Sequence, residues 1–141
     1  MIVLDTNVVS ELFRREPDVR VAAWLEALDG EVAITAITLA ELLAGVRRLP
    51  EGRRKSGLEA AVIAAVEPYR GSHALLPFDD DCAGAYADIL FERERAGLPI
   101  ATADAQIAAI CRTHDAVCAT RNTKDFVKTG IELIDPWTFS G

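Results

Sequence analysis

An aspartate directly follows a fully apolar run at the start of the chain: residues 1–4 are Met-Ile-Val-Leu, and Asp5 comes next. A short apolar run without polar alternation is typical of a strand that is buried on both faces, as in parallel sheets covered by helices. Asp5 would then lie at the carboxyl end of this strand, the edge at which open α/β sheets bind their ligands. Because a carboxylate is costly to remove from water, this position requires a partner that compensates its charge.

Short apolar segments and amphipathic segments alternate along the rest of the chain. After the first strand we expect strands over residues 31–35, 74–78, 116–120 and 131–134. We expect helices over residues 8–13, 21–28 and 39–46, an alanine-rich one to about residue 66, one from its N-cap Asp79 to about residue 97, and one that opens near Thr102. This alternation predicts an α/β fold with three layers, in which helices cover both faces of a central, mainly parallel sheet.

The length and the apolar segments limit the class of protein. The 141 residues suit one domain over residues 1–141. The longest apolar stretch, residues 60–66, is too short to cross a bilayer, and no basic region precedes the apolar start as in a signal peptide. The three cysteines, Cys82, Cys111 and Cys118, show no Cys-x-x-Cys spacing, which favours reduced thiols in the core. We therefore expect a cytoplasmic protein without a membrane segment.

The formal net charge of −7 argues against a broad nucleic-acid-binding surface, because phosphate repels such a protein at long range. One basic segment stands out against this background and consists of Arg47, Arg48, Arg53, Arg54 and Lys55. It has two interpretations. It is either a solvated helix end and loop or a local edge that contacts the phosphates of a nucleic acid.

Acidic residues recur where the predicted strands end and the predicted helices begin. Asp5 follows the first strand, Glu41 lies in the expected first turn after the second strand, and Asp104 lies in the first turn of the helix before the fourth strand. That fourth strand is followed directly by Thr120, Asn122 and Asp125. Since the carboxyl ends of parallel strands share one edge of a sheet, we expect these side chains to converge.

Each of these acids also has a structural interpretation. Asp5 can be the N-cap of the first helix, Glu41 can close a capping box with Thr38, and Asp125 can be a turn residue. Asp104 is harder to explain in this way, because it lies on the apolar face of its helix.

Convergence of these acids would require a cation. Two carboxylates about 4 Å apart repel each other by roughly 4 kcal/mol at an effective dielectric of 20. The donors are all hard oxygens, and His73 and His114 lack ligand-like spacing, so Mg²⁺ or Mn²⁺ is favoured over zinc. Such a site suits phosphodiester hydrolysis. The motifs of common nucleotide-binding proteins, serine hydrolases and zinc proteases do not occur.

Four segments carry a resemblance to a known family. They are Leu-Asp-Thr-Asn at 4–7 with Ser10-Glu11, Thr-Leu-Ala-Glu-Leu at 38–42 followed by Gly45, Ala-Asp-Ala-Gln-Ile-Ala-Ala at 103–109, and Ala-Thr-Arg-Asn-Thr-Lys-Asp-Phe at 119–126. In this order and spacing they resemble PIN-domain ribonucleases, specifically the VapC-type toxins of bacterial toxin–antitoxin pairs. The ending Asp135-Pro136-Trp137 is similar to that of the FitB-like subgroup.

The resemblance implies a five-stranded parallel sheet and Mg²⁺-dependent endonucleolytic cleavage of single-stranded RNA. It also implies a homodimer and a small antitoxin whose tail blocks the site and whose own fold binds operator DNA.

The resemblance also assigns roles to single residues. Asp5, Glu41 and Asp104 match the metal-holding acids of the family. Thr6, Asn7 and Thr120 match its supporting polar residues. Asp125 is the candidate for the fourth acid, and Asn122 stands where some relatives have an aspartate and would supply a neutral oxygen or position water.

Two other functions are compatible with the sequence. The acidic composition and the absence of an acid at position 122 allow an inactive module that acts through an antitoxin and DNA. A phosphatase of the haloacid-dehalogenase type also has an aspartate after its first strand. Such an enzyme requires a second acid as general acid, at the position where this chain has Asn7.

Overall fold

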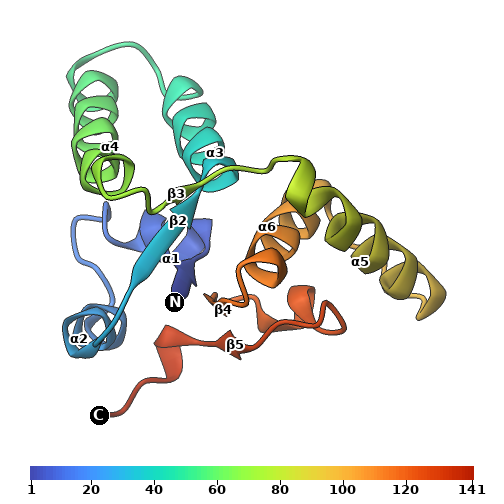
Figure 1. Ribbon diagram of the computed structural model, residues 1–141. Coiled ribbons are helices and arrows are strands. Elements are labelled where there is room, and N and C mark those ends of the chain that lie inside the picture. Colours follow the sequence, from blue (N-terminus) through green and yellow to red (C-terminus); the bar gives the residue numbers. More distant parts are fainter.

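The centre of the molecule is a sheet of five parallel strands (Figure 1). In a computed structural model that describes residues 1–141, the strands are β1 (Ile2–Leu4), β2 (Val32–Thr35), β3 (Leu75–Leu76), β4 (Val117–Ala119) and β5 (Leu133–Ile134). Their order is β3-β2-β1-β4-β5, and each neighbouring pair is parallel. The predicted parallel sheet is therefore confirmed, with β1 at its centre.

Helices cover both faces of this sheet, as Figure 1 shows. One face is covered by α1 (Thr6–Glu11), α2 (Val19–Ala27), α3 (Ala36–Arg47) and α4 (Arg53–Gly71). The other is covered by α5 (Ala83–Arg95) and α6 (Thr102–Thr113). Three short 3₁₀ turns complete the fold: η1 (Asp80–Cys82), η2 (Thr123–Phe126) and η3 (Pro136–Thr138). No helix combines the length and the apolar character that a membrane span requires.

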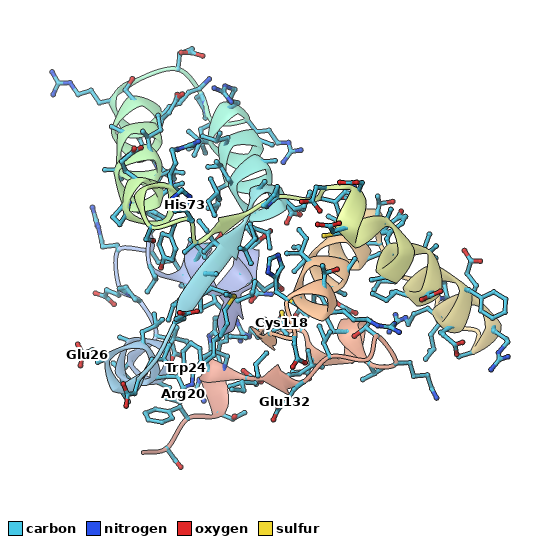
Figure 2. All side chains as sticks on the ribbon, in the orientation of Figure 1. Arg20, Trp24, Glu26, His73, Cys118 and Glu132 are labelled. Atoms are coloured by element: carbon cyan, nitrogen blue, oxygen red, sulfur yellow. The ribbon has the colours of Figure 1, made fainter.

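The short strands are apolar throughout because alternate side chains enter two different cores, one on each face of the sheet. Val3 packs on the side of α5 and α6, whereas Leu4, the next residue, packs on the side of α1 to α4. On β4, Cys118 (labelled in Figure 2) packs in the core below α5 and α6, whereas Ala119 packs in the other core. Burial of each Val or Leu side chain stabilises the fold by about 1.5–3 kcal/mol. The three cysteines are free and buried, as expected.

Several helix boundaries differ from the sequence-based expectation: α1 spans Thr6–Glu11 rather than residues 8–13, and Asp79 caps the 3₁₀ turn η1 that precedes α5 rather than α5 itself. Two further differences concern α4 and α3. Helix α4 continues to Gly71 rather than ending near residue 66, although Pro68 lies inside it. Pro68 cannot donate to the carbonyl of Ala64, but Ala64 is exposed, so water can satisfy that carbonyl. Beyond Pro68, Tyr69 still packs against the core, which favours continuation of the helix.

The start of α3 is the second of these two differences. Its N-cap is Thr35, whose hydroxyl accepts a hydrogen bond from the backbone N–H of Thr38 at 3.0 Å. The helix therefore begins at Ala36, and the predicted capping box between Thr38 and Glu41 is wrong. Glu41 lies in the second turn of α3 rather than in the first. Its side chain is free to bond elsewhere.

Candidate active site at the carboxyl edge of the sheet

The carboxyl ends of β1 and β4 lie side by side and bring together residues that are far apart in sequence. Leu4 pairs with Ala119, and the backbone N–H of Asp5 donates to the Ala119 carbonyl at 2.9 Å. This register places Asp5 next to Thr120. The predicted meeting of strand ends at one edge is thus confirmed for these two strands.

Asp5 is buried, with 4% of its surface exposed, and both of its carboxylate oxygens accept hydrogen bonds. One oxygen, Oδ1, accepts from the backbone N–H of Thr6 at 2.8 Å, so Asp5 is the N-cap of α1. The other, Oδ2, accepts from the hydroxyl of Thr120 at 2.8 Å and from the side-chain amide of Asn7 at 3.1 Å. Asp5 therefore serves as a helix cap and also joins a polar network across the sheet.

The pKa of Asp5 is raised above its ordinary value. Burial raises it most, and the charge of Glu41 adds to this, while the bonds from Thr120, Thr6 and Asn7 lower it. The hydrogen bonds thus only partly compensate the desolvated carboxylate.

Glu41 lies on α3, and a hydrogen bond from Thr6 joins its carboxylate to the site. The hydroxyl of Thr6 donates to Glu41 Oε1 at 2.6 Å and lies 3.1 Å from the hydroxyl of Thr38. The Glu41 side chain is exposed. Thr6 therefore links α1 to α3 through its hydrogen bond to Glu41.

Asp104 is the least compensated acid of the group. It lies in the first turn of α6, is half-buried, and forms no hydrogen bond or ion pair in the structure. Burial raises its pKa to about 6, helped by the negative charges of Asp5, Asp125 and Glu41, and only Arg93 acts in the opposite direction. Apart from the charge of Arg93, nothing in the protein offsets the charge of this carboxylate, and in this sense it is uncompensated.

Asp5, Glu41 and Asp104 line one open pocket of about 460 Å³. Most of its other lining residues are polar or charged: Thr6, Asn7, Ser10, Glu11, Arg14, Arg121, Asn122 and Trp137. Asp5, Glu41 and Asp104 come from three different elements, so the fold brings together the acids that were singled out first.

Asp125 and Asn122 occupy less central positions. Asp125 lies in η2, where its backbone N–H donates to the Asn122 carbonyl at 2.9 Å, and it is absent from the pocket lining. Its charge still contributes to the raised pKa of Asp104. Asn122 lines the pocket, and its backbone N–H donates to the Thr120 hydroxyl at 3.1 Å. The structure brings Asn122 into the pocket lining and leaves Asp125 outside it.

The donor set fits a hard divalent cation. No group of three or more acidic, histidine or cysteine side chains is arranged so that it could hold a metal ion by itself. Mg²⁺ does not require such a group, because it is commonly held by one or two carboxylates and keeps several of its waters. Oxygen donors face the pocket together with the uncompensated carboxylate of Asp104, and this combination favours Mg²⁺ or Mn²⁺.

Five residues of the pocket were not singled out as site residues from the sequence: Ser10, Glu11, Arg14, Arg121 and Trp137. Glu11 is buried and accepts from the backbone N–H of Asp18 at 2.8 Å and from Arg14 at 3.3 Å. The i, i+3 spacing of Glu11 and Arg14 was a usable signal. Arg121 and Trp137 lie in segments that carry the family resemblance, but their places in the pocket depend on how the chain returns to the sheet edge after β4 and β5.

The basic segment is partly neutralised by neighbouring acids. Arg47 forms an ion pair with Glu59 at 3.5 Å, and Lys55 forms one with Glu51 at 2.6 Å. Arg48 is exposed at the end of α3. These contacts suit the interpretation as a solvated helix end, at least for Arg47 and Lys55.

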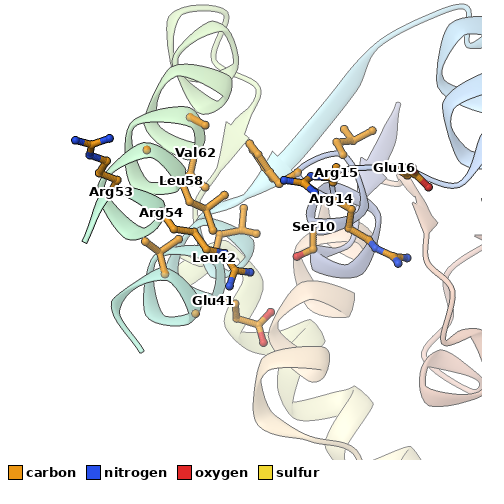
Figure 3. Close-up of a pocket in the computed structure, with 16 residues that line it drawn as sticks. Ser10, Arg14, Arg15, Glu16, Glu41, Leu42, Arg53, Arg54, Leu58 and Val62 are labelled. Atoms are coloured by element: carbon orange, nitrogen blue, oxygen red, sulfur yellow. The ribbon is translucent and has the colours of Figure 1, made fainter. Parts of the chain in front are cut away.

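Arg53 and Arg54 line a second, larger groove of about 1270 Å³ between α1, α3 and α4. Figure 3 shows Arg54 extending in the direction of Glu41, whereas Arg53 points away from the groove. The apolar part of the lining is formed by Leu12, Phe13, Leu42, Val46, Leu58, Ala61 and Val62. Because Ser10, Arg14 and Glu41 line both cavities, the groove adjoins the acidic pocket.

Comparison with known proteins identifies the family. Residues 2–132 match the model of the PIN domain. The chain is 41% identical over 138 residues to a VapC ribonuclease, Y4jK, of Sinorhizobium fredii (97% of this chain, 98% of the relative) and to Toxin FitB of Neisseria gonorrhoeae (97% and 99%). It also superimposes on a solved structure of FitAB bound to a DNA fragment, with a TM-score of 0.91, 38% identity and coverage of 100% and 99%. This chain belongs to the PIN-domain family.

Proposed function

We propose that this chain is a Mg²⁺-dependent endoribonuclease that cleaves single-stranded RNA and acts as the toxin of a toxin–antitoxin pair. The observation that carries the proposal is the uncompensated carboxylate of Asp104, which shares an open acidic pocket with Asp5 and Glu41. The names of the relatives, a VapC ribonuclease and a toxin, support the choice of RNA as substrate. The proposal describes one nuclease domain, residues 1–141, that acts in the cytoplasm.

Asp5 and Asp104 would hold the Mg²⁺, with Glu41 and Asp125 contributing charge. When bound, Mg²⁺ lowers the pKa of a coordinated water and stabilises negative charge on the phosphate. Thr120 and Asn7 fix the orientation of Asp5 through their bonds to Oδ2. Such outer contacts commonly change metal affinity or activity by about 10–100-fold.

Thr6 would orient Glu41 in the same way that Thr120 and Asn7 orient Asp5. Its hydroxyl holds the Glu41 carboxylate at the rim, on the side where the pocket meets the larger groove. Glu41 is exposed and thus accessible to an incoming water or substrate group. Asn122 offers a neutral amide on the pocket wall that can position water.

We further propose an antitoxin as the protein partner. The larger groove suits a segment of such a partner, because its apolar wall is flanked by the arginines and it adjoins the acidic pocket. A segment seated there would block access to Asp104. The solved FitAB complex contains DNA, which supports contact with operator DNA through the antitoxin rather than through this acidic chain. We expect this chain to form a homodimer, as the resemblance implies.

The proposal is tested by incubating the purified chain with single-stranded RNA in Mg²⁺ or EDTA. We expect cleavage in Mg²⁺, no cleavage in EDTA, and loss of cleavage in Asp5→Asn and in Asp104→Asn. Asp88→Asn is a matched control, because Asp88 is exposed on α5 and lies outside the pocket. Cleavage that survives Asp104→Asn would refute the assignment.

Expression in bacteria separates the toxin from an inactive module. We expect the wild-type chain to arrest growth, and co-expression of the partner encoded beside it to relieve the arrest. An inactive module would not arrest growth and would leave RNA intact in every condition.

A further inference from the structure

Arg121 lies at the rim of the acidic pocket and is held over an aromatic ring. Its guanidinium carbon is 5.1 Å from the centroid of the Trp137 ring. Trp137 is only 6% exposed, and its backbone N–H is fixed by a 2.9 Å bond to Asp135 Oδ1. The ring is therefore a rigid platform for the cation.

The backbone of Arg121 is tied to the same polar network as Asp5. Its N–H donates to Asn7 Oδ1 at 3.2 Å, and the amide nitrogen of Asn7 donates to Asp5 Oδ2 at 3.1 Å. Arg121 also directly follows Thr120, whose hydroxyl binds Asp5. Both ends of the Arg121 residue, backbone and guanidinium, are thus positioned relative to the acids.

The guanidinium of Arg121 has no polar partner in the protein. Although Asp5, Glu11, Glu41 and Asp104 line the same pocket, Arg121 forms no ion pair, and its only hydrogen bond uses the backbone N–H. By contrast, the other arginine of the pocket, Arg14, is paired with Glu11 at 3.3 Å. The N–H donors of Arg121 remain available to a ligand.

We propose that Arg121 binds a phosphate of the RNA strand as it enters the acidic pocket. This inference rests on the proposed ribonuclease function. Guanidinium presents two parallel N–H donors that match two oxygens of a phosphate group. A cation is needed at this rim, because a chain with a net charge of −7 and a pocket with four acids otherwise repels the substrate. Trp137 limits the conformations of Arg121, so less conformational entropy is lost on binding.

RNA binding and cleavage by matched variants test this role. The probe is a fluorescein-labelled single-stranded RNA that the wild-type chain cleaves. We expect Arg121→Ala to raise KM about tenfold with a smaller effect on kcat, Arg121→Lys to recover part of the loss, and Trp137→Leu to have an intermediate effect. The control is Arg70→Ala, which removes an exposed arginine on α4 that is paired with Glu67 at 3.9 Å. It should leave KM unchanged.

A second readout separates phosphate contact from a purely structural role. In an Asp104→Asn background, which prevents cleavage, the affinity for the RNA is measured by anisotropy over a range of salt concentrations. Loss of one phosphate contact should reduce the slope of log affinity against log salt by about 0.7. Mn²⁺ binding by the single variant Arg121→Ala should remain as in the wild type.

The outcomes distinguish this inference from the proposed function. If the wild-type chain cleaves RNA and Arg121→Ala keeps its KM and its salt slope, Arg121 is not a phosphate-binding residue and the inference fails alone. If Arg121→Ala loses Mn²⁺ binding as well, the residue acts through the fold and the inference also fails. If the wild-type chain cleaves no RNA, the proposed function fails and the inference with it.

Discussion

Asp104 shows at the scale of one residue how far sequence reasoning extends. Its place on the apolar face of α6 could be predicted from helical spacing, and this place argued against a purely capping role. The absence of any hydrogen bond or ion pair to its carboxylate could not be predicted. That absence depends on side chains from three other elements, and it makes Asp104 a stronger candidate ligand than Asp5, which has three bonds of its own.

The raised pKa of Asp104 predicts a pH-dependent stability of the metal-free protein. The pKa is about 6 in the folded state and 3.8 for a free aspartate side chain, so the folded state binds the proton more tightly. Above about pH 6 this carboxylate destabilises the fold, and the penalty disappears as the pH falls towards 4. After allowance for solvent screening, the penalty near neutral pH is about 1–2 kcal/mol.

Urea unfolding in EDTA checks this expectation. Asp104→Asn should be more stable than the wild type near neutral pH, and the difference should vanish near pH 4. The control Asp88→Asn should show no such pH-dependent gain. A wild-type chain whose stability relative to Asp104→Asn is the same at both pH values would contradict the assigned environment of Asp104.

Thr120 tests the polar support of Asp5. Thr120→Val keeps the shape of the side chain but removes the 2.8 Å bond to Asp5 Oδ2. We expect Mn²⁺ affinity and RNA cleavage to fall by about 10–100-fold, because the carboxylate loses its orientation. Calorimetry and initial rates measure the two effects. Thr113→Val, which removes a 2.8 Å bond to the Ala109 carbonyl at the far end of α6, should change neither.

At the scale of elements, Arg93 connects the end of α5 by hydrogen bonds to the two segments that flank the site. It is 4% exposed, and its guanidinium donates to the carbonyls of Leu98 at 2.7 Å, Pro99 at 3.3 Å and Val127 at 2.8 Å. Residues 98 and 99 lead into α6 with Asp104, and Val127 follows η2 with Asp125. The buried guanidinium of Arg93 therefore connects, through hydrogen bonds to carbonyls, the two segments that carry Asp104 and Asp125.

Removal of Arg93 should destabilise the protein substantially. We expect Arg93→Met to lower the free energy of unfolding by about 2–4 kcal/mol, because three carbonyls lose a donor inside the fold. Arg95→Met, on the same helix, should cost less than about 1 kcal/mol, since Arg95 is 70% exposed and its contact with Glu92 is 3.8 Å long. Denaturant unfolding of both variants measures the difference. Equal losses would show that the carbonyl contacts of Arg93 do not stabilise the fold.

The boundaries of α3 show why some elements resist prediction. Thr35 and Thr38 are both suitable N-caps by residue type, and Glu41 follows Thr38 at capping-box spacing. The register of β2, which ends at Thr35, decides between them. Because sheet pairing determines that register, local sequence could not, and the role of Glu41 as a partner of Thr6 emerged only in the structure.

At the scale of the whole molecule, the order of the strands creates the site. Asp5 and Thr120 are neighbours because β1 lies between β2 and β4, although 115 positions separate them. The alternation of strands and helices predicted a parallel sheet and a shared acidic edge. It could not predict which loops complete the pocket, so Arg121 and Trp137 were identified only as parts of family-like segments and not as site residues.

The central claim is that the acids at this edge form one divalent-cation site. Isothermal titration of the metal-free protein with Mn²⁺ near neutral pH tests it without relying on activity. We predict saturable binding by the wild type, at least a tenfold loss of affinity in Asp5→Asn and in Asp104→Asn, and unchanged binding in Glu26→Gln, whose side chain lies on α2 away from the site (Figure 2). A wild-type chain that takes up no Mn²⁺, or an Asp104→Asn variant that binds it as tightly as the wild type, would contradict this account.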